Sequence, residues 1–97
     1  MNEDFESAVV AVLQSLSAGE VVTYGEVAEQ AGFPRAARAV GNLLRRTGDD
    51  VPWWRVVSAS GHLRCQNLPR QIQLLRSEGV KVVDGRVVGR YRQQSRA

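Results

Sequence analysis

The first apolar residues of the chain recur with the period of an amphipathic helix. They stand at i, i+4, i+7, i+8 and i+11 and are Phe5, Val9, Val12, Leu13 and Leu16. In a helix these positions share one face, which a small domain buries against its neighbours. The Ser-Ala-Gly sequence at 17–19 interrupts the pattern. We therefore expect a helix over residues 3–16, followed by a short extended segment at Val21-Val22.

A capping-box sequence marks the start of a second helix. Thr23 and Glu26 stand three residues apart, so each side chain can accept the backbone N–H of the other. We expect this helix to begin at Tyr24. Pro34 suits the first turn of a third helix, which we expect to run to about Arg46. Two short helices joined by a tight, glycine-containing turn predict a helix-turn-helix.

The predicted third helix carries polar residues on one face and small apolar residues on the other. The polar positions fall at i, i+3, i+7 and i+10 and are Arg35, Arg38, Asn42 and Arg45, with Arg46 as the alternative for the last. No acidic residue occurs between Pro34 and Asp49, and alanines flank Arg38 on both sides. Because a planar guanidinium suits phosphates and bases, this face indicates nucleic-acid binding. An arginine face that is only solvated is the alternative.

The two tryptophans of the chain are adjacent and follow Pro52. The proline predicts a turn, and the β-branched residues further on predict a strand over 54–57. Successive side chains alternate across a strand, so we expect Trp53 and Trp54 to face opposite sides. One ring would then anchor the core, and the other would lie on the surface or form the wall of a pocket. Residues 62–64 are expected to return as a partner strand.

The C-terminal third has a helix signal followed by a hairpin signal. Asn67 can cap a helix over 68–78, with Pro69 in its first turn. The side chains expected to bury this helix are Leu68, Ile72, Leu74 and Leu75. Two valine-rich segments flank Asp84-Gly85, a dipeptide that fits a type I′ turn. Together these elements predict a fold that is mainly α with small β-hairpins, of the winged helix-turn-helix type.

Length and composition indicate one domain of ordinary globular character. The chain has 97 residues, of which 43% are hydrophobic and 24% charged. We expect a basic C-terminal tail over 89–97. No apolar run approaches the ~18 residues of a membrane span, and the acidic N-terminus is unlike a signal peptide. The single cysteine is unable to form an internal disulfide, which fits a reducing cytoplasm.

The net charge of +3 conceals a sharp asymmetry along the chain. Residues 1–34 hold six acids and no Lys or Arg. Residues 35–97 hold all 13 basic residues against four acids, which gives +9 there and −6 before it. Twelve of the 13 basic residues are Arg. A one-sided basic surface is the usual electrostatic footprint of nucleic-acid binding.

The sequence lacks an obvious set of groups for enzymatic turnover. His62 is the only histidine and Cys65 the only cysteine, and no acid nearby would orient the histidine for a nucleophilic pair. One Cys and one His are too few for the usual zinc sites, and no glycine-rich phosphate loop is present. We therefore expect neither a metal nor a cofactor, and binding is favoured over catalysis.

Four segments carry a resemblance to a known family. They are Val22-Thr23-Tyr24-Gly25-Glu26-Val27-Ala28, Pro34-Arg35-Ala36-Ala37-Arg38-Ala39-Val40-Gly41, Pro52-Trp53-Trp54-Arg55-Val56-Val57 and Leu74-Leu75-Arg76-Ser77-Glu78-Gly79. In order and spacing they resemble the DNA-binding domain of the DNA alkylguanine alkyltransferases. The resemblance covers roughly residues 3–83, which implies a domain core over that range. The enzymes of that family have Pro-Cys-His-Arg-Val, whose Cys accepts the alkyl group. Here Trp53 takes the Cys position, as in the alkyltransferase-like proteins, and Trp54 takes the His position.

The resemblance implies a role for each matching residue. Arg38 matches the arginine finger that enters the base stack through the minor groove, and Tyr24 matches the tyrosine that crowds the neighbouring phosphate. The implied DNA-binding set is Tyr24, Arg35, Arg38, Ala39, Asn42 and Arg45. The implied lesion pocket is Trp53, Tyr24, Val56 and Arg64. Gln66 aligns with the loop arginine that stacks on the guanine in the family, so Arg64 is expected to substitute for it, with Arg70 as the alternative. Arg55 and Glu78 are expected to be structural and to pair with each other, since Trp54 removes the histidine that Glu78 orients in the enzymes.

The function implied is that of a non-enzymatic DNA damage sensor. Such a protein binds double-stranded DNA through the minor groove, rotates an O6-alkylguanine into its pocket and flags it for nucleotide excision repair proteins. We expect a monomer without a membrane partner. Two alternatives remain open: an alkyltransferase that uses Cys65, and a winged-helix transcriptional regulator that reads an undamaged operator in the major groove.

Overall fold

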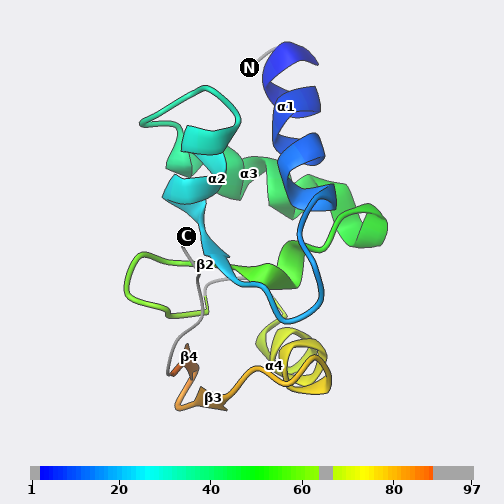
Figure 1. Ribbon diagram of the computed structural model, residues 1–97, viewed down its shortest axis with the longest axis vertical. Helices are drawn as coiled ribbons and strands as arrows, with labels where there is room; N and C mark the ends of the chain where they lie inside the picture. The colour runs from blue at the N-terminus through cyan, green and yellow to red at the C-terminus, as the bar shows by residue number, and fades with distance from the viewer. Residues whose placement is uncertain (1–2, 64–66, 89–97) are drawn as a thin grey trace.

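The computed structural model describes residues 3–63 and 67–88. Over these residues the chain forms α-helices, 3-10 helices and short strands (Figure 1). In chain order they are α1 (Glu3–Gln14), β1 (Val22–Thr23), α2 (Tyr24–Gln30), α3 (Ala37–Thr47), η1 (Gly48–Asp50), η2 (Trp53–Arg55), β2 (Val56–Val57), α4 (Leu68–Ser77), β3 (Val82–Val83) and β4 (Arg86–Val87). The expected class, mainly α with small strands, is confirmed.

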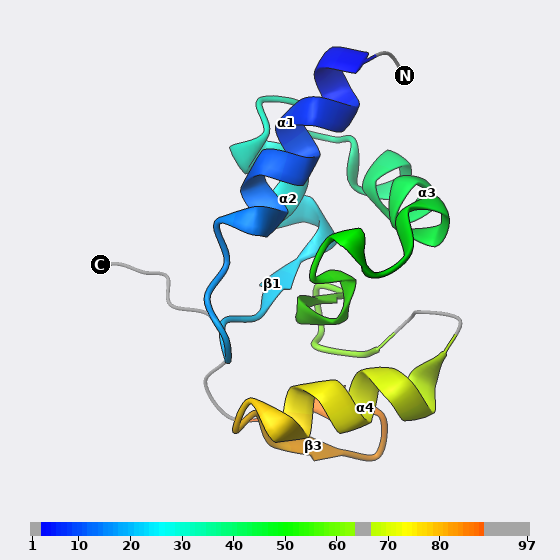
Figure 2. The ribbon, with the colours of Figure 1, turned by 90° about the vertical axis from the view of Figure 1, so that its right-hand side faces the viewer.

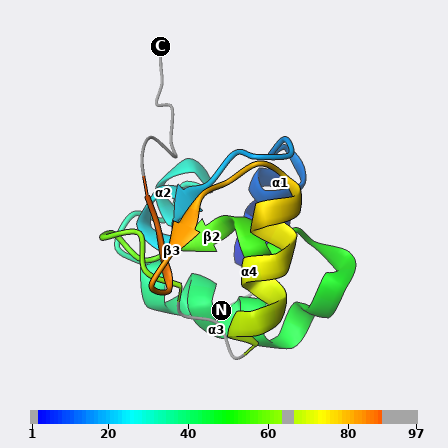
Figure 3. The same ribbon diagram turned by 90° about the horizontal axis from the view of Figure 1, so that it is seen from below.

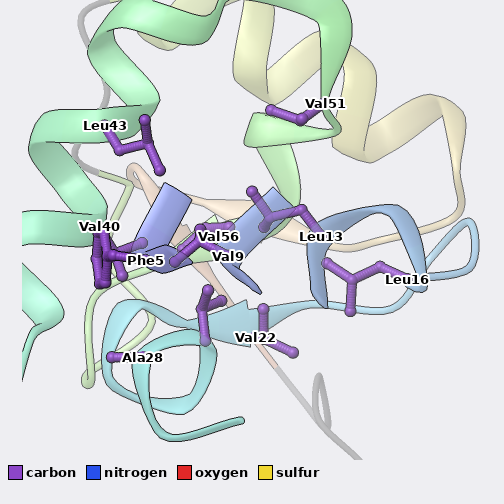
Figure 4. Close-up of a cluster of buried hydrophobic side chains, with 11 residues drawn as sticks. Phe5, Val9, Leu13, Leu16, Val22, Ala28, Val40, Leu43, Val51 and Val56 are labelled. Carbon is purple, nitrogen blue, oxygen red and sulfur yellow. The ribbon is translucent and has the colours of Figure 1, made fainter. Parts of the chain in front are cut away.

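The first three helices enclose one hydrophobic cluster, which Figure 4 shows. α1 contributes the residues that its periodicity predicts, and Phe5, Val9 and Leu13 are each at most 2% exposed. α3 contributes Val40 and Leu43, at 0% and 1%. The expected helix-turn-helix is therefore present as α2 and α3, which share a core with α1.

A parallel pair of short strands separates this cluster from a second one (Figure 2). β1 and β2 pair with Val22 opposite Val56, and both of these side chains belong to the helical cluster. Their neighbours Val21 and Val57 belong to the second cluster. Because successive side chains in a strand point to opposite faces, two β-branched residues in each segment supply both clusters.

The second cluster lies between α4 and the β3–β4 hairpin, which Figure 3 shows side by side. The Asn67 side chain caps α4 by accepting the backbone N–H of Arg70 at 3.2 Å, as expected. The hairpin is also confirmed: Asp84 and Gly85 have φ values of 54° and 72°, and a type I′ turn requires positive φ at both central residues. Leu68 is 38% exposed, so its predicted burial is wrong.

The third helix begins later than predicted. Arg35 has a φ of 82°, in the left-handed region, and Ala36 is the N-cap of α3. Pro34 lies in the preceding turn, in which the backbone N–H of Ala36 donates to the carbonyl of Phe33 at 3.1 Å. The Phe33 ring packs edge to face on Phe5 with centroids 5.1 Å apart. This anchor holds the turn in place, so Arg35 does not share the helical face of Arg38.

The predicted strand over 54–57 and its predicted partner are also different. Residues Trp53–Arg55 form the 3-10 helix η2, and only Val56 and Val57 are extended. β2 pairs in parallel with β1 rather than with residues 62–64, and His62 instead bridges to Arg86 of β4. The hairpin prediction failed because strand pairing is decided between segments distant in sequence. No helix of the described residues is long and apolar enough to cross a membrane.

The capping box at the start of α2 is formed in both directions. The Thr23 hydroxyl accepts the Glu26 N–H at 3.0 Å, and the Glu26 carboxylate accepts the Thr23 N–H at 2.8 Å. We expect Thr23→Ala to lower the free energy of unfolding by about 1 kcal/mol, or the melting temperature by about 4–8 °C. Ser15→Ala, at an exposed hydroxyl, is the control and should change stability by less than about 0.5 kcal/mol. Equal melting curves for the two variants would contradict the cap.

Candidate functional site

A cavity of about 340 Å³ opens beside α3. We call it the α3 pocket and define it by the side chains that line it: Tyr24, Ala37, Arg38, Gly41, Leu44, Arg45, Trp53 and Ser58. Most of these residues lie on α3, while α2, η2 and the segment after β2 each provide one. The volume is within the usual range for a small-molecule site, roughly 300–1,000 Å³.

The α3 wall of the pocket follows from helix geometry. Its residues stand at i, i+1, i+4, i+7 and i+8 from Ala37, which is one helical face. Ala37 and Gly41 project little or no side chain into the pocket. A Cβ added at position 41 would lie 3.8 Å from the Tyr24 ring. Arg38, Arg45 and the aromatic side chains of Tyr24 and Trp53 line the same cavity.

The structure brings some of the predicted site residues together. Tyr24, Arg38, Arg45 and Trp53 all line the α3 pocket. Arg35 lies outside it, exposed in the turn before α3. These four residues come from three different elements, so their proximity is a product of the tertiary fold.

The remaining predicted residues lie elsewhere. Ala39 packs against the helical cluster, and the Asn42 side chain accepts a hydrogen bond from Arg45. Val56 is 0% exposed in the core and is not among the residues that line the pocket. Arg64 lies outside the described residues.

Sequence reasoning overlooked part of the lining. Ala37, Gly41 and Leu44 stand three or four residues apart along α3, on the face next to Arg38 and Arg45. Helix geometry could therefore have predicted them as lining residues. Ser58 carries no local signal, because it reaches the pocket only through the path of the chain after β2.

The two tryptophans occupy different clusters and contact each other. Trp53 packs against the helical cluster and Trp54 against the second cluster. Their rings meet edge to face, with centroids 5.8 Å apart and planes at 88°. In a 3-10 helix successive side chains point about 120° apart, which separates the two rings without placing them on opposite faces of a strand. The predicted strand at Trp54 is therefore wrong, but the two rings do reach different clusters as expected, and Trp53 is the ring at the pocket.

The Glu78 carboxylate, at the C-terminal end of α4, ties together three segments. Arg55 donates two hydrogen bonds to it, at 3.0 and 2.7 Å, and the backbone N–H of Gly19 donates a third at 2.8 Å. Arg55 also donates to the carbonyl of Leu16 at 2.9 Å. The pairing of Arg55 with Glu78 is thus confirmed. Both side chains are 12% exposed, so the pair holds the end of α1, η2 and α4 in one place.

Trp54 takes part in this network, against expectation. Its indole N–H donates to Glu78 Oε2 at 2.9 Å, so the replacement of the family's histidine does not remove a donor from the carboxylate. The Arg55 guanidinium carbon also lies 5.4 Å from the centroid of the Trp54 ring. The indole reaches Glu78 because η2 turns Trp54 towards α4, which a strand would not do.

Hydrogen bonds keep Glu78 ionised. Burial raises the pKa of the Glu78 carboxyl, but the hydrogen bonds from Arg55, Gly19 and Trp54 and the charge of Arg55 outweigh it. The net result is a pKa below the ordinary value. The Gln71 side chain adds a further link from α4, since its amide N–H group donates to the carbonyls of Trp54 and Val56 at 3.0 and 3.3 Å.

Of the two groups considered for catalysis, only His62 lies in the described part of the chain, and it is not among the residues that line the α3 pocket. His62 Nδ1 lies 2.7 Å from the Ser60 hydroxyl on an exposed turn. Cys65 lies outside the described residues. Within residues 3–63 and 67–88, no group of three or more His, Cys, Asp and Glu side chains has a metal-binding arrangement.

A family model and several relatives match the chain over most of its length. The model described as the DNA-binding domain of 6-O-methylguanine DNA methyltransferase matches residues 4–80. The "DNA base-flipping protein" of Vibrio parahaemolyticus is 39% identical over 84 residues, which cover 82% of this chain and 84% of the relative. The Escherichia coli protein of the same name is 44% identical over 84 residues, which cover 82% of this chain and 65% of the relative.

The same comparison extends to fungi and to a solved complex. "Alkyltransferase-like protein 1" of Schizosaccharomyces pombe is 31% identical over 86 residues, covering 82% of this chain and 80% of the relative. The crystal structure of S. pombe Atl1 with damaged DNA containing O6-carboxymethylguanine matches with a TM-score of 0.84 at 27% identity. That match covers 98% of this chain and 99% of the S. pombe chain.

The lowered pKa of Glu78 gives a stability change with a defined pH dependence. A carboxyl whose pKa is lower in the folded state stabilises the fold above its unfolded pKa, and this contribution is lost as the pH falls through the folded pKa. We expect Glu78→Gln to lower the free energy of unfolding by roughly 2 kcal/mol at pH 7. The difference from wild type should shrink steadily below about pH 4, as measured by urea denaturation at each pH.

Glu29→Gln, at an exposed position of α2, is the matched control for that measurement. It should change the unfolding free energy by less than about 0.5 kcal/mol at pH 7 and at pH 3. A Glu78→Gln deficit of the same size at pH 7 and pH 3 would show that the ionised carboxylate is not the cause.

Proposed function

Because the chain belongs to the family of the 6-O-methylguanine DNA methyltransferase DNA-binding domain, we propose that it is a non-enzymatic sensor of alkylated DNA. In this proposal it binds double-stranded DNA through the minor groove and receives an O6-alkylguanine, rotated out of the duplex, in the α3 pocket. The bound protein then marks the site for nucleotide excision repair.

The observation that carries the proposal is Trp53 in the wall of the α3 pocket, next to Tyr24 and Arg38. By the motif resemblance, Trp53 occupies the position of the alkyl-accepting cysteine in the family's enzymes. An indole offers a flat apolar face to a base but no thiolate to attack an alkyl carbon. The cavity of about 340 Å³ suits a nucleobase with a small substituent. A pocket with these walls favours retention of the lesion over its repair.

Arg38 is suited to fill the space that a rotated nucleotide leaves. It is exposed on the first turn of α3, borders the pocket and has alanines on both sides. Removing a base from the stack costs a few kcal/mol, and less for a damaged base whose pairing is weakened. A guanidinium that enters the gap restores stacking and adds a positive charge among phosphates.

The names of the relatives support the proposed function. Two of them are named for base flipping, and the S. pombe Atl1 structure holds DNA with an O6-alkylated guanine. The link to nucleotide excision repair is what the family resemblance implies. Physical reasoning agrees with it, because minor-groove wedges bend DNA and a sensor without turnover stays on its lesion. A long-lived, bent complex is then the signal that excision proteins recognise. We propose a monomer without a cofactor for this role.

Replacement of the finger should abolish discrimination between damaged and intact DNA. We expect Arg38→Ala to weaken binding to a duplex with one O6-methylguanine by about 10- to 100-fold, in line with the loss of about 1–3 kcal/mol. Affinity for the undamaged duplex should fall far less. Fluorescence anisotropy with both duplexes at one fixed salt concentration measures this, because ionic strength sets the baseline affinity.

Arg46→Ala is the charge-matched control. Arg46 lies on the same helix, is exposed and does not line the pocket. Both variants remove one positive charge, so both should lose the same non-specific electrostatic affinity, but Arg46→Ala should keep the wild-type ratio of the two dissociation constants. Equal ratios in the two variants would disprove the finger assignment, and equal wild-type affinities for the two duplexes would disprove the proposed function.

The enzymatic alternative makes an opposite prediction about mass. An alkyltransferase that used Cys65 would retain one alkyl group after incubation with O6-methylguanine DNA. We expect the intact mass of the protein to stay unchanged and the lesion to be recovered intact from the DNA. A mass increase of one methyl group, absent in Cys65→Ser, would establish the alternative.

A further inference from the structure

Trp54 contacts the pocket tryptophan on one side and the Glu78 network on the other. Its indole N–H donates to Glu78 Oε2 at 2.9 Å, and its ring meets the ring of Trp53 edge to face, with centroids 5.8 Å apart. The guanidinium of Arg55 lies over the same indole, 5.4 Å from its centroid. The residue therefore lies between the α3 pocket and the salt bridge without lining the pocket itself.

The partners of Trp54 are themselves held in place. The Glu78 carboxylate accepts hydrogen bonds from Gly19 and Arg55 in addition to the indole. The carbonyl of Trp54 accepts a hydrogen bond at 3.0 Å from Gln71, a side chain that is 0% exposed on α4. The backbone and the ring of Trp54 are thus each fixed to α4, one by an amide and the other by a carboxylate.

We infer that Trp54 is a positioning residue for the α3 pocket, which transmits the fixed position of Glu78 to the ring of Trp53. The inference rests on the proposed function for its consequence in binding. Trp53 packs against the helical cluster and lines the pocket, and its ring meets that of Trp54 edge to face, so Trp54 is among the contacts that set the tilt of the Trp53 ring. A binding group left free to shift by about 1 Å loses much of its effect.

The hydrogen bond is the part of Trp54 that this role requires. A phenyl ring at position 54 would still present an aromatic group to Trp53, but it has no N–H to fix its rotation against Glu78. An imidazole is smaller and still has an N–H to donate. Trp54→Phe and Trp54→His therefore separate the effect of the donor from the effect of the ring.

Both variants leave Trp53 as the only tryptophan in the protein, since positions 53 and 54 hold the only two. Its emission then reports its own surroundings without interference from a second indole. Without DNA, we expect Trp54→Phe to show a red-shifted Trp53 emission and stronger quenching by iodide than Trp54→His. Circular dichroism and melting curves confirm that both variants are folded at the assay temperature, since Arg55 still pairs with Glu78 in each.

Anisotropy with O6-methylguanine and undamaged duplexes measures the consequence for binding. We expect Trp54→Phe to lower the ratio of the two affinities by about tenfold with little change for the undamaged duplex. Trp54→His should stay within about threefold of the wild-type ratio. A wild-type ratio in Trp54→Phe, or equal losses in both folded variants, would overturn the inference. If wild type itself shows no lesion preference, the proposed function fails, while the emission comparison still decides whether Trp54 fixes Trp53.

Discussion

The Glu78 carboxylate is the constraint on which the rest of this structure depends. It accepts hydrogen bonds from the loop after α1, from two nitrogens of Arg55 and from the indole of Trp54. A two-strand parallel pair alone is a weak scaffold, because each strand contributes only two residues. The carboxylate supplies the long-range connection that these short strands lack. Its low pKa shows that the network stabilises the ionised form despite burial.

This connection explains how so small a domain holds a preformed cavity. Its two hydrophobic clusters lie on opposite faces of the β1–β2 pair, and η2 reaches both, with one tryptophan in each. One wall of the α3 pocket lies on α3, which belongs to the helical cluster. Another wall is Trp53, whose ring contacts Trp54 and through it the second cluster. Preformed walls favour retention of an extruded base, because the protein loses little conformational freedom on binding.

The chemistry of the pocket differs from that of an alkyl acceptor in one respect that matters. Tyr24, Arg38 and Trp53 line the α3 pocket, and under the proposed function an indole stands where the family's enzymes have their nucleophile. By the motif resemblance, Trp54 stands at the position of the histidine in the family's enzymes. Its indole N–H donates to Glu78 Oε2 at 2.9 Å, and an indole is a hydrogen-bond donor only.

The amino-acid sequence by itself determined the local elements and the type of site. The period of Phe5, Val9 and Leu13, the capping box at Thr23 and the Asp84-Gly85 turn depend on interactions within a few residues, so their patterns were sufficient. The family resemblance pointed to Tyr24, Arg38 and Trp53, and the structure places all three around one pocket. Tertiary structure decided what depends on distant partners. The Phe33–Phe5 contact moved the start of α3 to Ala37, the pairing of β2 with β1 replaced a hairpin, and Glu78, 24 residues along the chain, oriented Trp54. Local patterns carry no information about such partners, because the contact energies arise only when the chain has folded.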